Sequence, residues 1–285
     1  MCEIGRGEVD TGSLRPFAEK NVLITGAGRG IGKRFALGFA GAGACVGLVA
    51  RSQAELNAAQ LEIEHTGGRA IALHADVRDF SQVSQAVDCM VGMSGPVSIL
   101  IAAAAVQGPI GPFALSDPAQ WKETLEANIL GVMNSIRAVL PDMIERRSGK
   151  IVVITGGGAA TARPNFAPYA ASKAAVVRLV ESIAGEVDGA NIQINCFAPG
   201  GSYTSMTDEI LHAGSLAGEQ ERQDAQQIRL SGGVSAERQI AAILFLASDR
   251  SNHINGKMIH VNDDLKRLEQ GSLRPDTYTL RRLKN

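Results

Sequence analysis

Short apolar segments alternate along the chain with longer segments in which apolar residues recur at helical spacing. A run that is apolar throughout is typical of a strand buried on both faces, and apolar residues three and four positions apart indicate a helix. This pattern predicts strands over residues 21–25, 44–50, 69–75, 97–102, 150–155, 192–198 and 258–261. It predicts intervening helices over about residues 30–42, 53–66, 81–93, 118–146, 169–188 and 236–248.

Strands that alternate with helices indicate an α/β fold whose parallel sheet is covered by helices on both faces. We therefore expect one doubly wound domain over residues 20–264, with a central parallel sheet of about seven strands. Within it, residues 201–233 form a long polar stretch that is predicted to be irregular. A stretch of this length inside a compact domain is typical of a lid over a substrate or of a disordered segment.

The two ends of the chain lie outside this domain. Residues 1–19 are a polar N-terminal extension with no apolar signal stretch. Residues 265–285 are a basic tail, for which we expect contact with solvent or with another subunit, the alternative being a role in binding an anionic substrate. Its basic residues are Lys266, Arg267, Arg274, Arg281, Arg282 and Lys284, against Glu269 and Asp276.

Composition narrows the class of partner. The formal net charge of −1 gives no general reason to expect nucleic-acid binding, and the aromatic content of 4% argues against a surface on which bases stack. No apolar run approaches the length of a membrane span. No cluster of carboxylates and histidines suggests a metal site.

The cysteines indicate a reducing compartment. Cys2, Cys45, Cys89 and Cys196 are scattered, without the close pairs that bind metals or carry redox chemistry. Three of them lie in apolar periodic segments, so we expect buried free thiols and a cytoplasmic protein.

A glycine-rich turn follows the first predicted strand and opens the first predicted helix. Glycine allows a sharp turn and lets the backbone approach a pyrophosphate, which the helix N-terminus then binds through N–H groups and its dipole. This strand–turn–helix context predicts a nucleotide site of the Rossmann type. The turn is Thr25-Gly-Ala-Gly-Arg-Gly-Ile-Gly, so the candidate cofactor-binding residues are Gly26, Gly28, Arg29, Gly30, Ile31 and Gly32.

The residues after the second strand distinguish between cofactors. An acidic residue there would bind the ribose 2′-hydroxyl of NAD, but this chain has Arg51. Arg51 and Arg29 can pair with a 2′-phosphate, which favours NADP(H). Asp76, after the third strand, is placed to accept a hydrogen bond from the adenine amine, or else it caps the following helix.

Tyr169 and Lys173 are the candidate catalytic pair. Residues four positions apart lie on one face of a helix. An ammonium group beside a phenol favours the phenolate, which would lower the pKa of Tyr169 from about 10 toward the working pH. We therefore expect Tyr169 to act as a general acid/base on a carbonyl or hydroxyl group.

With these motifs in one order, the chain resembles the short-chain dehydrogenase/reductase family over about residues 20–262. The resemblance rests also on Asp76-Val77, Asn128 and Pro199-Gly200 with Thr204. It implies that Tyr169 exchanges a proton with the substrate and that Lys173 also holds the nicotinamide ribose. It further implies that Asn128 anchors a relay water, that Val77 belongs to the cofactor site, and that Pro199, Gly200 and Thr204 border the nicotinamide.

The chain departs from the family pattern in two places. Residues 102–105 are four alanines where the family usually has Asn-Asn-Ala-Gly, which affects local hydrogen bonding more than chemistry. Gly156 occupies the position of the family serine that hydrogen-bonds the substrate oxygen. Thr155 offers the same hydroxyl one residue earlier, and we expect it to be the donor; the alternative is that no hydroxyl is present and the reaction is slower.

The sequence thus predicts an NADP(H)-dependent enzyme that interconverts a ketone and a secondary alcohol, with Tyr169, Lys173, Asn128 and Thr155 as catalytic residues. Two alternatives stay open: an NADP-binding protein with weak or no catalysis, and an epimerase or dehydratase of the same fold. Self-association into a homodimer or homotetramer is implied by the resemblance. The mixture of pocket candidates favours a polar or anionic small molecule over a sterol; the alternative is that Arg163 and Asn165 are ordinary solvent-facing loop residues, and His212 is expected to be an exposed lid residue rather than a catalyst. The candidates are Gln107, Thr155, Arg163, Asn165, Tyr203, Met206 and His212.

Overall fold

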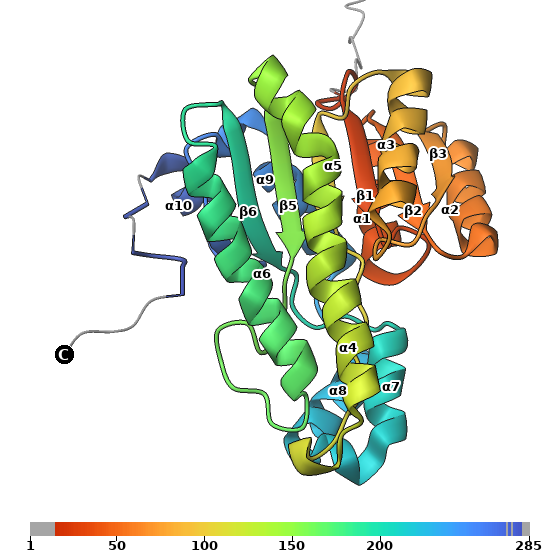
Figure 1. The fold of residues 1–285 in the computed structure, drawn as a ribbon, viewed down its shortest axis with the longest axis vertical. Coiled ribbons are helices and arrows are strands. Elements are labelled where there is room, and N and C mark those ends of the chain that lie inside the picture. Colours follow the sequence, from red (N-terminus) through yellow and green to blue (C-terminus); the bar gives the residue numbers. More distant parts are fainter. Residues whose placement is uncertain (1–14, 272, 275, 281–285) are drawn as a thin grey trace, which may run out of the picture.

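The computed structural model describes residues 15–271, 273–274 and 276–280, and in them a seven-stranded parallel sheet forms the centre of the molecule (Figure 1). Its strand order is β3-β2-β1-β4-β5-β6-β7. The strands are β1 (Asn21–Thr25), β2 (Cys45–Ala50), β3 (Arg69–His74), β4 (Ile99–Ala102), β5 (Gly149–Ile154), β6 (Ile192–Ala198) and β7 (Met258–His260). The predicted doubly wound fold is confirmed, and each predicted strand matches an observed one to within two residues at either end.

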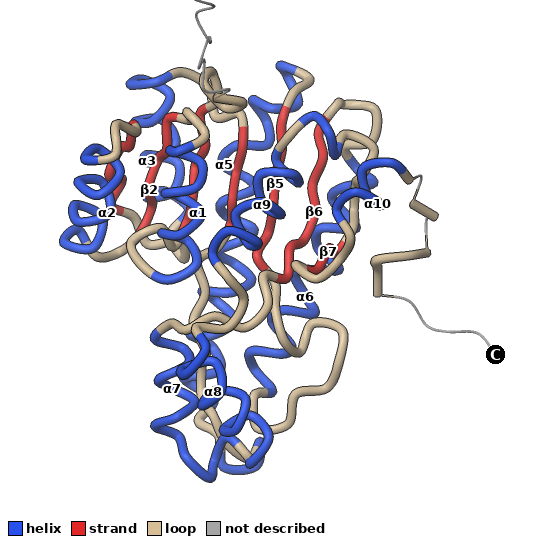
Figure 2. The backbone as a smooth tube through the Cα atoms, turned by 180° about the vertical axis from the view of Figure 1, so that it is seen from behind, coloured by secondary structure: helices blue, strands red, loops and turns tan. Residues whose placement is uncertain are grey.

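Helices cover both faces of the sheet, because its central strands are apolar on both sides. α3 (Phe80–Ser94), α5 (Gly131–Arg146) and α6 (Ala167–Glu186) pack on the face that is turned toward the viewer in Figure 1. The opposite face is covered by α1 (Gly30–Gly41), α2 (Gln53–His65) and α9 (Ala236–Ala247). Figure 2 turns this face toward the viewer. Each layer has its own apolar cluster against the sheet.

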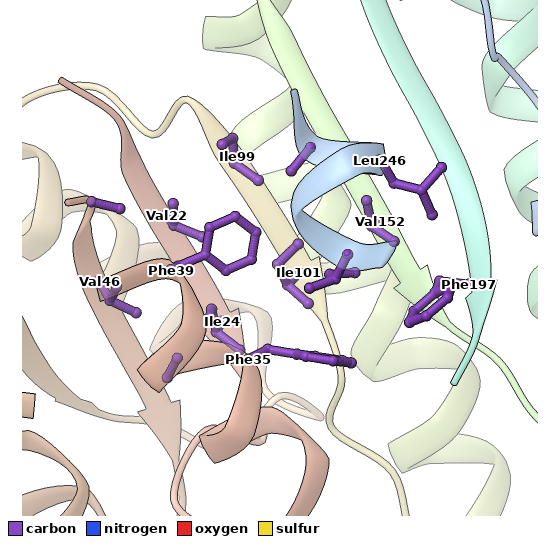
Figure 3. Packing of buried hydrophobic residues seen from close by; sticks show 14 of the residues in the cluster. Val22, Ile24, Phe35, Phe39, Val46, Ile99, Ile101, Val152, Phe197 and Leu246 are labelled. Atoms are coloured by element: carbon purple, nitrogen blue, oxygen red, sulfur yellow. The ribbon is translucent and has the colours of Figure 1, made fainter. Parts of the chain in front are cut away.

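The cluster under α1 and α9 fixes the first helix over the sheet (Figure 3). Phe35 and Phe39, one turn apart on α1, are fully buried against the strands. Phe35 also packs on Phe197 of β6, with ring centroids 6.1 Å apart. Burying one such ring stabilises the fold by roughly 2–3 kcal/mol, so these contacts hold the N-terminal end of α1 at the end of β1.

The direction in which successive strands are added to the sheet reverses between β1 and β4. From β1 the order runs to β2 and β3 on one side, and from β4 to β7 on the other. Loops that follow neighbouring strands at such a point diverge and leave a crevice at the carboxyl ends, where open α/β sheets bind their ligands. The glycine turn and the four-alanine loop therefore lie side by side at this crevice.

The segment 201–233 is largely helical, which corrects the expectation of an irregular stretch, while its role as a substrate lid stays a prediction. It contains α7 (Ser205–Ala213), a 3₁₀ turn (Gly214–Ala217) and α8 (Glu219–Ser231). These elements lie below the carboxyl ends of the strands in Figure 1, beside α4 (Pro118–Leu125). Their apolar contact is a small separate cluster around Phe166 and Ile210.

The predicted helix 118–146 is one continuous rod of three parts. A π-helical turn (Glu126–Leu130) joins α4 to α5. A π turn adds a residue to the helical repeat and is often found at functional sites. Besides the 3₁₀ turn at Gly214–Ala217, the described residues form two further 3₁₀ turns, at Phe113–Leu115 and Asp249–Ser251. The last described helix, α10 (Leu265–Gln270), follows β7.

Part of the predicted tail packs against the domain itself. The backbone N–H of Met258 in β7 donates to Tyr278 O at 2.7 Å, and Lys257 Nζ donates to the carbonyls of Arg274 and Thr277, each at 3.0 Å. The tail residues Arg281, Arg282 and Lys284, and most of the N-terminal extension, lie outside the described residues.

The cysteine prediction is partly wrong. Cys45 and Cys196 are buried free thiols, but Cys89 is exposed, because it lies on the outer side of α3. Cys2 lies outside the described residues. None of the helices in residues 15–280 that the structure describes is long and apolar enough to span a membrane.

Candidate active site

Tyr169 lies in the first turn of α6, and Lys173 lies one turn further along the same face. The Tyr169 side chain is buried, with Lys173 Nζ 5.5 Å from the ring centroid. Lys173 is 2% exposed, and its Nζ donates to Ile154 O, the last residue of β5, at 3.0 Å. The end of β5 therefore fixes the direction of the lysine, and the helix fixes the direction of the phenol.

The pKa values of this pair correct one expectation. Burial raises the pKa of the Tyr169 phenol, because a phenolate is costly in an apolar environment. Burial also lowers the pKa of Lys173 to about 8. The net shift of the Tyr169 pKa is therefore upward, opposite to the expected one. Lys173, whose Nζ donates to Ile154 O, is not among the groups that lower it.

Arg163 is the charged side chain that lowers the pKa of Tyr169, in opposition to burial. Its guanidinium carbon lies 4.0 Å from the ring centroid of Phe166 and 5.4 Å from that of Tyr169. Two hydrogen bonds of 2.7 and 2.8 Å join it to the carboxylate of Glu221 on α8. Arg163 thus links the Tyr169 ring at the start of α6 to α8.

Asn128 sits in the π-helical turn and is fully buried. Its Oδ1 accepts from the backbone N–H of Val106 at 2.8 Å, and its Nδ2 donates to Val106 O at 2.9 Å. The same Nδ2 donates to Ser172 Oγ at 3.0 Å, and Ser172 Oγ donates to Tyr169 O at 2.7 Å. Ser172, which sequence reasoning missed, therefore connects Asn128 to the backbone of the candidate catalytic residue.

The loop after β4 keeps its hydrogen bonds despite the four alanines. The hydroxyl of Thr25 accepts from the backbone N–H groups of Ala103 and Ala104 at 3.2 and 3.3 Å. Together with the Asn128 contacts at Val106, these bonds hold the loop from both ends. The departure from the family pattern is thus compensated by a threonine of β1.

Thr155 and Gly156 follow β5 and pass directly beside α6, the helix that carries Tyr169. Thr155 is 3% exposed, and its hydroxyl donates to Lys173 O at 3.4 Å. This bond turns the hydroxyl toward the helix backbone, so the geometry gives no support to Thr155 as a donor to the substrate oxygen. A Cβ built on Gly156 would lie 3.3 Å from Tyr169 Oη.

The glycine turn has the shape that a pyrophosphate requires. Gly26 has a φ of +70°, and a Cβ there would lie 2.8 Å from Ala104 Cα. A Cβ on Gly32 would lie 2.2 Å from Gly26 O. Arg29, the residue before α1, caps the helix with no side-chain hydrogen bond, so the first N–H groups of α1 stay available for an anion. These residues fit a dinucleotide, and Ile31 turns inward against the core.

Charges of both signs surround the end of β2, where the two cofactors would differ. Arg29 Nη1 lies 3.7 Å from Glu55 Oε1, and a Cβ on Gly28 would lie 3.1 Å from Glu55 Oε2. Sequence reasoning missed this carboxylate, because Glu55 lies on α2 rather than at the end of the strand. Arg51 is exposed beyond it.

Asp76 is already engaged in the described structure. Its carboxylate accepts from Arg78 at 2.6–3.1 Å, and this pairing lowers its pKa. Arg51 also contributes to the lowered pKa of Asp76. Val77 is buried against Gly131, and Asn134 Nδ2 donates to Val77 O at 2.9 Å, so this loop is fixed from behind.

Pro199, Gly200 and Thr204 lead from β6 into α7. Gln239 Nε2 donates to Pro199 O at 2.6 Å, and Gly200 takes a φ of +73°. Thr204 caps α7, and its Cγ2 would lie 3.5 Å from a Cβ on Gly30. The start of the 201–233 segment thus lies beside the glycine turn, and the role of Thr204 at the nicotinamide stays a prediction.

The remaining pocket candidates differ in exposure: some are buried or partly exposed, and others lie on the surface. Gln107 is buried, with no hydrogen-bond partner for its Nε2 among the described residues, and Asn165 and Met206 are partly exposed. Tyr203 is 44% exposed and donates to Asp208, and His212 is exposed. Within residues 15–280 as far as they are described, no group of histidine, cysteine and carboxylate side chains could hold a metal ion.

The order of these elements matches known proteins. A family model described as short chain dehydrogenase matches residues 20–214. The chain belongs to the short-chain dehydrogenase/reductase family. It is therefore an oxidoreductase that depends on a nicotinamide cofactor.

Three members of the family show the extent of the likeness. The 3-oxoacyl-(acyl-carrier-protein) reductase FabG of Staphylococcus aureus is 33% identical over 245 residues, which cover 85% of this chain and 96% of the relative. The gluconate 5-dehydrogenase of Gluconobacter oxydans is 35% identical over 244 residues, 84% of this chain and 92% of the relative. A gluconate 5-dehydrogenase from Burkholderia cenocepacia, solved in complex with NADP and tartrate, is 30% identical with a TM-score of 0.77, covering 89% and 97% of the two chains.

Proposed function

We propose that the chain is an NADP(H)-dependent oxidoreductase that interconverts a ketone and a secondary alcohol, with Tyr169 as general acid/base. The observation that carries this proposal is the position of Tyr169: its phenol oxygen faces the backbone of Gly156, and Lys173 is fixed behind it by Ile154 O. A carbonyl oxygen bound beside Gly156 would receive the phenol proton. The nicotinamide, when bound, supplies or accepts the hydride at the carbonyl carbon.

The preference for NADP(H) rests on charge at the end of β2. Arg29 and Arg51 are both exposed there, and an arginine fork matches a 2′-phosphate. A relative from Burkholderia cenocepacia was solved with NADP, which supports the same choice. Asp76 is proposed to bind the adenine, with Arg78 holding its carboxylate in place.

Lys173, Asn128 and Ser172 support the proton transfer without touching its reacting atoms in the described structure. We expect Lys173 to bind the nicotinamide ribose and Asn128 to orient a relay water. The proposed assembly is a homodimer or homotetramer, a state that the resemblance to the family suggests.

Steady-state oxidation of NADPH with a panel of ketones tests the proposal. We expect turnover with at least one ketone, loss of about 10³-fold or more in kcat for Tyr169→Phe, and unchanged NADPH binding in that variant, because general acid catalysis and alignment are lost together. Equal rates for the two proteins would overturn the role of Tyr169.

The same panel separates the alternative functions. Tight NADPH binding without turnover of any carbonyl would favour a binding protein that lacks the family hydroxyl at position 156. Conversion of substrate without net consumption of cofactor would favour an epimerase or dehydratase.

A further inference from the structure

Position 156 places no side chain beside the phenol oxygen of Tyr169. Gly156 comes two residues after the end of β5, and among the described residues Tyr169 Oη is the one heavy atom within 4 Å of a Cβ built there, its chain neighbours aside. The Cβ lies 3.3 Å from Oη, so a hydroxyl held close to this point could approach the phenol oxygen to within the roughly 2.5–3.0 Å of an O–H···O hydrogen bond. The chain supplies no such group from position 156.

The adjacent hydroxyl is directed elsewhere. Thr155 is 3% exposed, and its Oγ1 donates to Lys173 O. To reach the phenol, it would have to break that bond and leave a buried carbonyl less well satisfied, at a cost of about 1 kcal/mol or more. Glycines follow at 157 and 158, so the next two positions supply no side chain either, and Arg163 further along the loop is held by Glu221.

We propose that the substrate itself provides the hydroxyl, so that the site selects ketones with a hydroxyl group on the neighbouring carbon. The space beside Gly156 would hold that hydroxyl next to both the carbonyl oxygen and Tyr169 Oη. There it donates to the carbonyl oxygen as negative charge develops, which a side-chain hydroxyl would otherwise do. The inference rests on the proposed ketone reduction and names the substrate class that this site takes, α-hydroxy ketones and the vicinal diols they form.

The backbone permits a direct test at this position. Gly156 does not have a positive φ, unlike Gly158 at +92°, so a larger residue is not excluded by backbone conformation. The atom that a Cβ there would meet, at 3.3 Å, is Tyr169 Oη, the end of a side chain rather than backbone. Serine at 156 would restore a built-in hydroxyl, and alanine would fill the space without one.

Three ketones distinguish hydrogen bonding from electronic activation. Hydroxyacetone and butan-2-one have the same shape, and methoxyacetone keeps the electron withdrawal of the oxygen but cannot donate. For the wild type we expect kcat/KM with NADPH to be about 10- to 100-fold higher for hydroxyacetone than for the other two, because one aligned donor contributes on the order of 10²–10³ in rate. Gly156→Ser should raise the value for butan-2-one about tenfold or more and reduce the ratio to within about twofold. Gly156→Ala should lower the value for hydroxyacetone without raising the others.

The outcomes separate this inference from the proposed function. A wild-type ratio near one, or equal rates for hydroxyacetone and methoxyacetone, overturns the inference while turnover itself upholds the oxidoreductase. Turnover of butan-2-one by Gly156→Ser, with no turnover of any ketone by the wild type, overturns it as well, since the substrate hydroxyl then fails to substitute. Absence of turnover in both proteins, with NADPH binding intact, overturns the proposed function instead.

Discussion

Arg163 and Glu221 join two parts of the candidate active site that are 58 residues apart in sequence. Both guanidinium contacts are short, at 2.7 and 2.8 Å, and the arginine side chain is 14% exposed. A two-point pair of this kind fixes orientation as well as distance, and at low exposure it is less screened by salt. The loop before α6 and the first turn of α8 are therefore coupled at the edge of the Tyr169 ring.

Removing either partner should shift the pH dependence of the reaction in opposite directions. Arg163 lowers the pKa of Tyr169, and Glu221 offsets the charge of Arg163. We expect Glu221→Gln to move the Tyr169 ionisation in kcat/KM for alcohol oxidation to lower pH, and Arg163→Met to move it to higher pH, each by about half a unit to one unit.

The other charges that face Tyr169 do not change in this experiment. Lys173 on α6 is retained in both variants, and Glu219→Gln is the matched control, because it removes the exposed pair with Arg222 on the same turn of α8. A shift in the control as large as in Glu221→Gln would contradict the assignment.

The carboxylate of Glu55 should reduce the preference for NADP(H). It pairs with Arg29, so a 2′-phosphate has to compete for that arginine. We expect Glu55→Gln to tighten NADP binding about two- to fivefold with little change for NAD, as measured by calorimetry. Arg51→Gln should weaken NADP binding and leave NAD binding nearly unchanged.

A control for the cofactor experiment is available on the same helix. Glu62 pairs with Lys33 further along α2, and Glu62→Gln removes a surface charge of the same sign away from the glycine turn. An equal gain in NADP affinity in this variant would point to net charge rather than to Glu55.

Asn128 bonds both the loop at Val106 and Ser172 of α6, so its removal should lower the free energy of unfolding and loosen the attachment of α6. Asn128→Ala leaves the N–H and C=O of Val106 without their side-chain partner, so we expect unfolding free energy to fall by about 3 kcal/mol or more in urea titration. Ser172→Ala should cost about 1 kcal/mol. The double variant should cost less than the sum, because the two share a bond.

Ser182 provides the comparison for Ser172, since its hydroxyl bonds to Arg178 O within α6 and to no other element among the described residues. Ser182→Ala should change stability and kcat little. Strict additivity of Asn128→Ala and Ser172→Ala would speak against a coupled network.

The buried Lys150, which is not part of the candidate active site, predicts that the free energy of unfolding changes with pH. It is 7% exposed in β5, its Nζ donates to Ser251 Oγ at 3.3 Å, and burial lowers its pKa to about 8, with Asp249 opposing the shift. Below about pH 8 the folded protein therefore holds a costly buried charge. Between about pH 8 and the pKa of 10.5 in the unfolded chain, the unfolded state keeps the proton that the folded state has lost. The free energy of unfolding therefore rises as the pH increases through this window.

Lys150→Met should remove this dependence. We expect it to stabilise the protein by about 1–3 kcal/mol at about pH 7 and by much less at about pH 10 in urea unfolding, because Ser251 keeps its bonds to Leu246 O and Ser248 O. Lys122→Met, at a side chain that is 76% exposed, is the control. A destabilised Lys150→Met at neutral pH would show that packing of the lysine stem outweighs its buried charge.

The strands and the parallel sheet were predictable from the sequence because most of the strands are largely apolar and are bounded by polar or glycine-containing turns. α8 was not, because its residues Glu219–Ser231 are almost all polar, with Ala225 the buried one. Such a helix has no apolar stripe, and it is stabilised by contacts such as Arg163–Glu221 that periodicity does not reveal.

Some features of the candidate site were likewise predictable from the sequence, and others were not. Spacing places Tyr169 and Lys173 on one helix face, but only the three-dimensional arrangement shows that Lys173 Nζ is directed at Ile154 O. Glu55 escaped notice because the direction of α2, rather than its place in the sequence, brings it to the glycine turn. The significance of Gly156 could be read from its offset to Tyr169, whereas the engagement of Thr155 with Lys173 O could not.

The π-helical turn at Glu126–Leu130 makes the length of this segment as important as its composition. Successive residues in an α-helix are rotated by about 100°, so deleting one residue there would restore α-helical winding and turn Asn128 away from Val106 and Ser172. A one-residue deletion would thus act like the loss of Asn128 itself while every side chain around the site is kept. In related chains, gaps aligned across this turn are therefore a warning that the architecture behind the catalytic helix differs, even where the tyrosine and lysine are both present.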